Sequence, residues 1–92
     1  MYEIIPSRRF ERSYKKLKQS GRFDPESLRS LLGFLREGIP PLFYYQDHLL
    51  AGEYKGCHEC HLKGNILLIY AIVDSIREIT LVDIGSHSEL FG

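Results

Sequence analysis

The spacing of apolar residues changes its period in the middle of the chain, near Pro40 and Pro41. Before this point apolar residues recur every three or four positions, which is typical of helices with one buried face. The two stripes are Phe10, Tyr14, Leu17 and then Leu28, Leu31, Leu32, Leu35. After this point the longest apolar stretch, Ile66–Val73, has the length of a buried strand. A helical half followed by a half built of strands indicates the α+β fold class.

Local start and stop signals bound the two helices. Ser7 is a candidate N-cap for the first helix, and Gly21 is placed to end it. Asp24 and Pro25 mark a second start, since an acidic N-cap and a proline at the first helical position favour helix initiation. Gly38 is placed to end the second helix, before the two prolines bar its continuation. These signals predict a helical hairpin.

Strands are expected on both sides of this hairpin. They are predicted at Tyr2–Ile5, Cys57–Lys63, Ile66–Val73 and Glu78–Ile84, and Leu49–Tyr54 could form a further short strand. Gly85 is expected to break the last strand, and Ser86–Gly92 to form a tail. We therefore expect a single domain over residues 1–92, of order β-α-α-β-β-β, with the hairpin packed on one face of a small antiparallel sheet. The uncovered sheet face is the natural place for a site.

Composition excludes several classes of protein. No run of about 18 apolar residues is present, so we expect no membrane span and no membrane partner. Met1–Ile5 lacks the features of a secretory signal, so we expect a cytoplasmic protein whose two cysteines are reduced. Net charge is zero, yet residues 1–36 carry nine Lys or Arg against four Asp or Glu. This basic half could meet phosphates or an acidic partner.

Much of that positive charge lies on the first predicted helix. The residues are Arg8, Arg9, Arg12, Lys15, Lys16 and Lys18. Such a string either solvates a helix face or binds phosphates. The sequence leaves both alternatives open.

All four histidines, His48, His58, His61 and His87, lie in the last 45 residues. Histidine is the side chain best suited to move protons near neutral pH. Alternation along Cys57–Lys63 directs Cys60 and Leu62 to the core and His61 outward, together with Cys57, Glu59 and Lys63. The histidines are therefore either candidate acid–base groups or ordinary surface imidazoles.

The string Cys57-His58-Glu59-Cys60-His61 also has the C-x-x-C-H spacing of haem attachment, and it could supply half of a zinc site. In a strand, however, Cys57 and Cys60 point to opposite faces. A buried, uncharged role is expected for Cys60. A metal-binding module built on Cys57, His58, Cys60 and His61 remains an alternative.

The order of short motifs in the second half resembles a known family. The motifs are Gln46-Asp47-His48, Leu50, Gly52, Lys55-Gly56, Glu59-Cys60-His61, Leu67-Leu68-Ile69-Tyr70 and Gly85-Ser86-His87-Ser88-Glu89-Leu90-Phe91. Together they resemble the YafQ branch of the RelE superfamily of toxin–antitoxin ribonucleases. The resemblance implies a toxin that binds the ribosome and cleaves messenger RNA there, and that a cognate antitoxin inhibits. DNA would be bound only through the antitoxin.

The resemblance also implies roles for individual residues. The ribose 2′-oxygen would attack the adjacent phosphate without a metal or cofactor. His48 and His61 would act at the 2′-hydroxyl or orient the phosphate, and His87 would be the general acid. Phe91 would stack on a base or position a neighbouring side chain.

Two positions depart from the family pattern. Asn65 stands where a carboxylate is typical, and Asp83 stands where an arginine is frequent. Losing one charge-stabilising group typically costs on the order of 10²–10³ in rate. Lys63, expected on the same strand face as His61, or Lys55 could bind the phosphate instead. The alternative is a catalytically weakened homologue that serves as an antitoxin-binding module.

Overall fold

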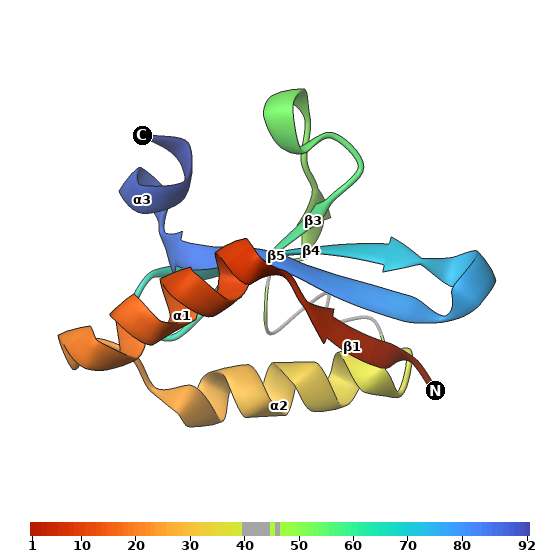
Figure 1. Cartoon of the computed structure of the whole chain (residues 1–92), viewed down its shortest axis with the longest axis horizontal. Helices are drawn as coiled ribbons and strands as arrows, with labels where there is room; N and C mark the ends of the chain where they lie inside the picture. Colours follow the sequence, from red (N-terminus) through yellow and green to blue (C-terminus); the bar gives the residue numbers. More distant parts are fainter. Residues whose placement is uncertain (40–44, 46) are drawn as a thin grey trace.

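The computed structural model describes residues 1–39, 45 and 47–92. Pro40 and Pro41, which were expected to bar the helix, and Gln46 of the family-like motif lie outside the described residues. The elements, in chain order (Figure 1), are β1 Glu3–Pro6, α1 Arg8–Ser20, α2 Pro25–Arg36, β2 His48–Leu49, the 3-10 helix η1 Gly52–Tyr54, β3 His58–Leu62, β4 Ile66–Val73, the 3-10 helix η2 Asp74–Ile76, β5 Glu78–Ser86 and α3 His87–Phe91.

The predicted helix caps are confirmed. The Ser7 hydroxyl accepts a hydrogen bond from the backbone N–H of Phe10, and the Asp24 carboxylate accepts one from the N–H of Glu26. Both bonds satisfy donors that the first helical turn leaves unpaired. Gly21 caps the end of α1 with a φ of 74°, a left-handed conformation in which glycine has no steric cost.

The strands form one five-stranded sheet of order β1-β5-β4-β3-β2. The α+β class is confirmed, and the expected β-α-α-β-β-β order is extended by one further short strand and by the helix α3. The strands β2 to β5 pair antiparallel as expected. The β1 strand differs, because it pairs parallel with β5 and makes the sheet mixed. A parallel pair needs a crossover connection, which the helical hairpin begins after β1.

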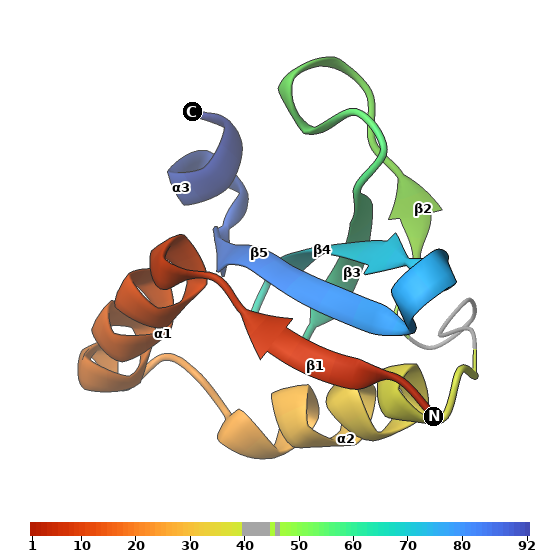
Figure 2. The ribbon, with the colours of Figure 1, turned by 45° about the vertical axis from the view of Figure 1, so that its right-hand side comes forward.

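The core lies between the helical hairpin and one sheet face. It consists of Phe10, Leu17, Leu28, Leu31, Leu35, Cys60, Leu62, Ile66, Leu68, Tyr70, Ile79, Leu81 and Ile84. Alternate positions of β3 and β4 contribute to it, so the residues between them face the other way. Figure 2 shows α3 and the segment around η1 projecting from the sheet on the side away from α2.

Two predicted elements are wrong. Leu49–Tyr54 is not a strand: β2 ends at Leu49, and the chain then forms η1. Gly85 does not break β5, which continues to Ser86, and the expected tail forms α3. A reciprocal capping box between Ser86 and Glu89 starts α3. No helix in the described part of the chain combines the length and apolarity needed to cross a bilayer.

Candidate active site

Side chains with acid–base chemistry form a row across the uncovered face of the sheet. Paired residues of neighbouring strands share a face. The pairings His48 with Glu59, Glu59 with Ile69, and Ile69 with Asp83 therefore align four residues from β2 to β5. His61 stands in the next row, opposite Leu67. The uncovered face thus joins His48 and His61, which are 13 positions apart in the sequence.

A buried carboxylate holds these two imidazoles together. Oε1 of Glu59 lies 3.1 Å from Nε2 of His48 and 3.3 Å from Nε2 of His61. The Glu59 side chain is only 8% exposed, whereas the His48 and His61 side chains are 51% and 40% exposed. A buried carboxylate needs such partners, so Glu59 fixes both rings while leaving them accessible. The sequence placed Glu59 on this face but gave no signal of its role.

The same three residues could bind a metal ion. One ring nitrogen of His48, one carboxylate oxygen of Glu59 and one ring nitrogen of His61 lie within 4.8 Å of one another. Imidazole and carboxylate are suitable ligands for zinc or copper. The group can therefore act either as a metal site or as a pair of histidines bridged by an acid.

The short helix α3 presents His87 and Phe91 on the same side of the sheet. The Ser86 hydroxyl accepts a hydrogen bond from the N–H of Glu89, and the Glu89 carboxylate accepts one from the N–H of Ser86. The hydrogen bond from the Ser86 N–H to the carboxylate lowers the pKa of Glu89, with a smaller contribution from the nearby Arg22 guanidinium. Glu89 therefore takes part in both hydrogen bonds of the capping box and stabilises the start of α3.

Ring contacts tie α3 to η1. The His87 and Phe91 ring centroids are 5.1 Å apart, and the Phe91 ring meets Tyr54 edge-on at 5.8 Å. His87 is exposed, while Tyr54 is buried. The rings of His48 and His61 are 6.0 Å apart. The structure thus brings His48 and His61 together around Glu59, and it places His87 beside Phe91.

Behind the site, Asp47 anchors the segment that carries His48. Its side chain is 5% exposed, and one oxygen lies 2.9 Å from Nδ1 of His58. The other oxygen accepts hydrogen bonds from the Cys60 thiol at 3.3 Å and from the Tyr70 hydroxyl. Burial, reinforced by the nearby carboxylate, raises the pKa of both Cys60 and Tyr70. Asp47 was part of the family-like motif, but its contacts join residues too far apart to be predicted.

The C-x-x-C-H string does not form one site. Cys60 contacts Asp47 on the core side, whereas His61 contacts Glu59 on the opposite face. Both cysteines are free thiols. Within the described residues, the group with metal-binding geometry contains two histidines and a glutamate, and no cysteine.

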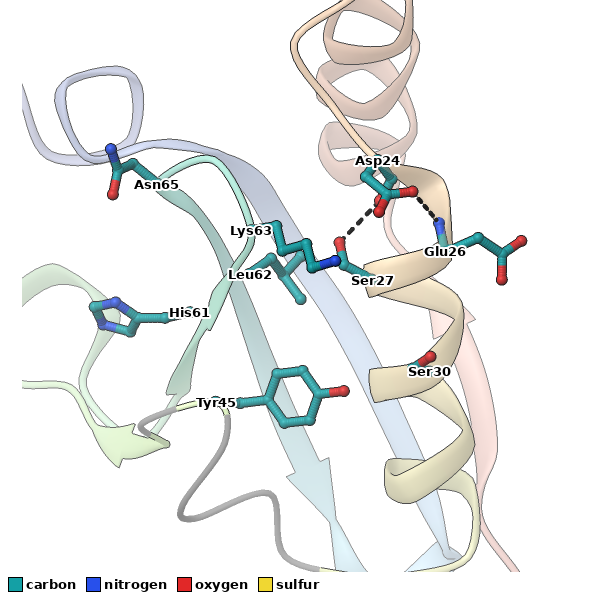
Figure 3. Close-up of a pocket in the computed structure, with 9 residues that line it drawn as sticks. All are labelled: Asp24, Glu26, Ser27, Ser30, Tyr45, His61, Leu62, Lys63 and Asn65. Atoms are coloured by element: carbon teal, nitrogen blue, oxygen red, sulfur yellow. Dashed lines mark hydrogen bonds between the residues drawn. The ribbon is translucent and has the colours of Figure 1, made fainter.

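The Lys63 side chain points in a different direction from the His61 ring. Figure 3 shows the Lys63 side chain extending toward Ser27 of α2, while the His61 ring points away from that helix. Both residues line a pocket of about 560 Å³. The expected shared face of Lys63 and His61 is therefore not found, because β3 ends at Leu62. Lys55 is exposed and follows η1.

The turn between β3 and β4 explains Asn65. Gly64 and Asn65 have φ angles of 75° and 59°, so both adopt the left-handed conformation. Asparagine tolerates this conformation better than most residues. The amide is therefore suited to the turn itself.

Asp83 is paired rather than directed at the solvent. Its side chain is 7% exposed, and Oδ2 lies 3.2 Å from Nε of Arg9. Oδ1 accepts a hydrogen bond from the N–H of Ile84 at 2.8 Å. A guanidinium at contact distance thus offsets the negative charge that Asp83 places where an arginine is frequent in the family.

The sequence matches a family of toxins along nearly its whole length. The family model described as the bacterial toxin of type II toxin–antitoxin systems, YafQ, matches residues 2–92. The mRNA interferase toxin YafQ of Escherichia coli K12 is 33% identical over 78 residues, covering 84% of this chain and 83% of that protein. A Haemophilus influenzae protein named for YafQ is 43% identical over 47 residues, which are 49% of this chain and about half, 46%, of that relative.

Solved structures share the fold. A metal-bound toxin from Helicobacter pylori superposes with a TM-score of 0.88 at 41% identity, covering 99% of this chain and 100% of that one. In the Escherichia coli DinJ–YafQ toxin–antitoxin complex, the matching chain gives a TM-score of 0.83 at 29% identity, covering 99% of this chain and 98% of that one.

Proposed function

Because the chain belongs to the YafQ family of toxins of bacterial type II toxin–antitoxin systems, we propose that it is a ribosome-dependent endoribonuclease that cleaves messenger RNA. The observation that carries this proposal is the bridging of His48 and His61 by the buried Glu59 on the open face of the sheet. Acid–base cleavage of RNA needs such accessible imidazoles held in fixed orientations. The family relative in Escherichia coli K12 is named an mRNA interferase.

The proposed reaction starts with attack of the ribose 2′-oxygen on the adjacent phosphate. His61 and His48 take the proton of the 2′-hydroxyl or orient the phosphate. A neutral imidazole that donates to Glu59 through Nε2 keeps Nδ1 as its basic nitrogen. Glu59 is thus a positioning residue for both rings, and it stabilises the imidazolium formed when one of them takes the proton.

His87 is the proposed general acid, which protonates the departing 5′-oxygen. Its exposed position at the start of α3 allows contact with RNA. Phe91 packs against the His87 ring and against Tyr54. We propose that this packing orients His87, and that the 40% exposed Phe91 ring also stacks on a base.

The proposed chemistry uses side chains alone, so cleavage is metal-independent. A metal ion bound by His48, Glu59 and His61 would occupy a ring nitrogen of each imidazole and compete with their positioning by Glu59. Metal binding would therefore inhibit this reaction. A function as a metal-binding module instead predicts stoichiometric metal in the purified protein, which elemental analysis would detect.

A cognate antitoxin is the proposed protein partner, and the cytoplasm is the proposed location. The Escherichia coli relative forms a complex with the antitoxin DinJ. DNA would be contacted only through the antitoxin. The basic helix α1 is proposed to contact ribosomal phosphates, so ribosome binding should weaken steeply with salt. Lys55 and Lys63 remain candidate phosphate ligands at the periphery of the site.

The deciding experiment supplies the purified chain to ribosomes translating a defined message and maps the RNA ends. Wild type should cleave, and His87→Ala and His61→Ala should each lose most of this activity while keeping the wild-type melting temperature. Cleavage that survives loss of His87 rejects it as the general acid. Absence of cleavage by a wild-type chain that still binds its antitoxin tightly would instead identify a weakened homologue acting as a binding module.

A further inference from the structure

We propose that Arg9, anchored by Asp83, binds a phosphate of the RNA beside the His48–Glu59–His61 group. This inference rests on the proposed ribonuclease function and adds a substrate-binding residue to it. The family resemblance leads one to expect an arginine at position 83. On this proposal, Asp83 instead holds an arginine that comes from α1.

The cross-strand row places Asp83 on the same face as the histidines. Glu59 pairs with Ile69, and Ile69 pairs with Asp83. Neighbouring strands lie about 4.8 Å apart, so the backbones of Glu59 and Asp83 are roughly 10 Å apart. Ile84 packs in the core, which independently directs its neighbour Asp83 to the uncovered face. A group bound to Asp83 is therefore within reach of an RNA segment seated on the imidazoles.

The start of α1 brings Arg9 to this face. Parallel pairing of β1 with β5 ends at Pro6 and Leu81. Ser7 then continues along the edge of β5, where its N–H donates to the carbonyl of Leu81 and its hydroxyl donates to that of Val82, each at 2.9 Å. Figure 1 shows the first turn of α1 against β5, near the point where α3 leaves the sheet. Arg9 can thus reach around the strand edge to Asp83.

The ion pair leaves the guanidinium able to bind an anion. Nε of Arg9 contacts Asp83, and a guanidinium carries five N–H donors, so donors remain for a phosphate oxygen. The Arg9 side chain is 56% exposed, whereas that of Asp83 is 7% exposed. The buried acid is fixed further by the N–H of Ile84. Asp83 therefore orients the guanidinium in advance, although it also reduces the net positive charge offered to the RNA.

The test compares Arg9→Gln with Arg29→Gln, which makes the same chemical change on α2, where Arg29 pairs with Glu26. Cleavage and affinity are measured on ribosomes carrying a short message at several salt concentrations. Arg9→Gln should reduce kcat/KM about 10- to 100-fold, mainly through KM, the range expected for losing one charged hydrogen bond. It should also reduce the slope of the logarithm of the binding constant against the logarithm of the salt concentration by about one. Arg29→Gln should change neither quantity.

A charge exchange separates binding from folding. Arg9→Asp and Asp83→Arg should each lower activity, and the double variant should regain at least tenfold over Arg9→Asp, since an arginine again stands on the uncovered face. Equal behaviour of Arg9→Gln and Arg29→Gln overturns the inference, as does a loss that follows thermal stability with an unchanged salt slope. If wild type binds ribosomes without cleaving, the ribonuclease proposal fails, and the salt slope of Arg9→Gln alone decides the role of Arg9.

Discussion

Two tyrosine–aspartate hydrogen bonds in this protein differ in burial and therefore should differ in their contribution to stability. The Tyr70 hydroxyl donates to Asp47 in the core, and the Tyr2 hydroxyl donates to Asp74 at the surface. Tyr70 is 1% exposed, whereas the Asp74 side chain is 75% exposed. Replacing each tyrosine by phenylalanine deletes one hydroxyl in both cases.

Tyr70→Phe should destabilise the fold strongly. Losing a buried hydrogen bond to a charged acceptor costs about 2 kcal/mol, because the carboxylate cannot recover it from water. In a domain of this size each kcal/mol changes the melting temperature by about 4–8 °C, so we expect a decrease of about 8–16 °C. Tyr2→Phe should leave the melting temperature unchanged, since water replaces the lost partner of Asp74.

Calorimetric melting at neutral pH measures both variants. Cleavage at a temperature where both are folded should fall for Tyr70→Phe only, because Asp47 adjoins His48. Equal decreases in melting temperature for the two variants would refute the argument that burial sets the strength of these bonds. Unchanged cleavage by Tyr70→Phe would refute the link between Asp47 and the site.

Three further predictions concern pH, metal ions and α3. Because the pKa values of Cys60 and Tyr70 are raised in the folded protein, the unfolded chain loses these protons at lower pH than the folded chain does. The free energy of unfolding should therefore be constant below about pH 9 and fall as pH rises further. Urea unfolding at a series of pH values should show this decrease, with a smaller slope in Cys60→Ala. Added zinc should inhibit RNA cleavage, and His48→Ala should bind zinc more weakly by calorimetric titration; tight binding by that variant would place the metal elsewhere. Glu89→Ala should reduce cleavage with little change in melting temperature. In wild type the pKa of Glu89 is lowered, so the stabilisation of α3 by its carboxylate is present above the ordinary pKa of 4.5 and is lost as pH falls below that value. Amide exchange of α3 as a function of pH can follow this loss.

The sequence predicted those parts of the fold that depend on local chemistry. The caps at Ser7 and Asp24 and the strand Ile66–Val73 rest on neighbours in the chain, and the structure confirms them. The parallel pairing of β1 joins Glu3 to Glu78 across the whole fold, and no local pattern reports it. The helix α3 was missed although Ser86 and Glu89 carry the spacing of a capping box.

For the candidate site, too, local patterns could be predicted from the sequence, whereas contacts between distant segments could not. Alternation directed Glu59 and His61 to the uncovered face, but the bridge to His48 depends on the register between β2 and β3. The pairing of Asp83 with Arg9 could not be predicted from the sequence, because the two residues are 74 positions apart. Sequence patterns thus indicated which residues carry chemistry, while pairing between distant segments decides what each of them contacts.

The parallel pairing of β1 with β5 also constrains how a newly made chain can fold. During translation β1 is synthesised first among these strands and β5 last, so the sheet cannot close until Glu78–Ser86 has left the ribosome. Arg9 meets Asp83, and α3 takes its place, only after that event. The proposed active site, which includes His87 of α3, therefore cannot assemble before β5 and α3 have been synthesised.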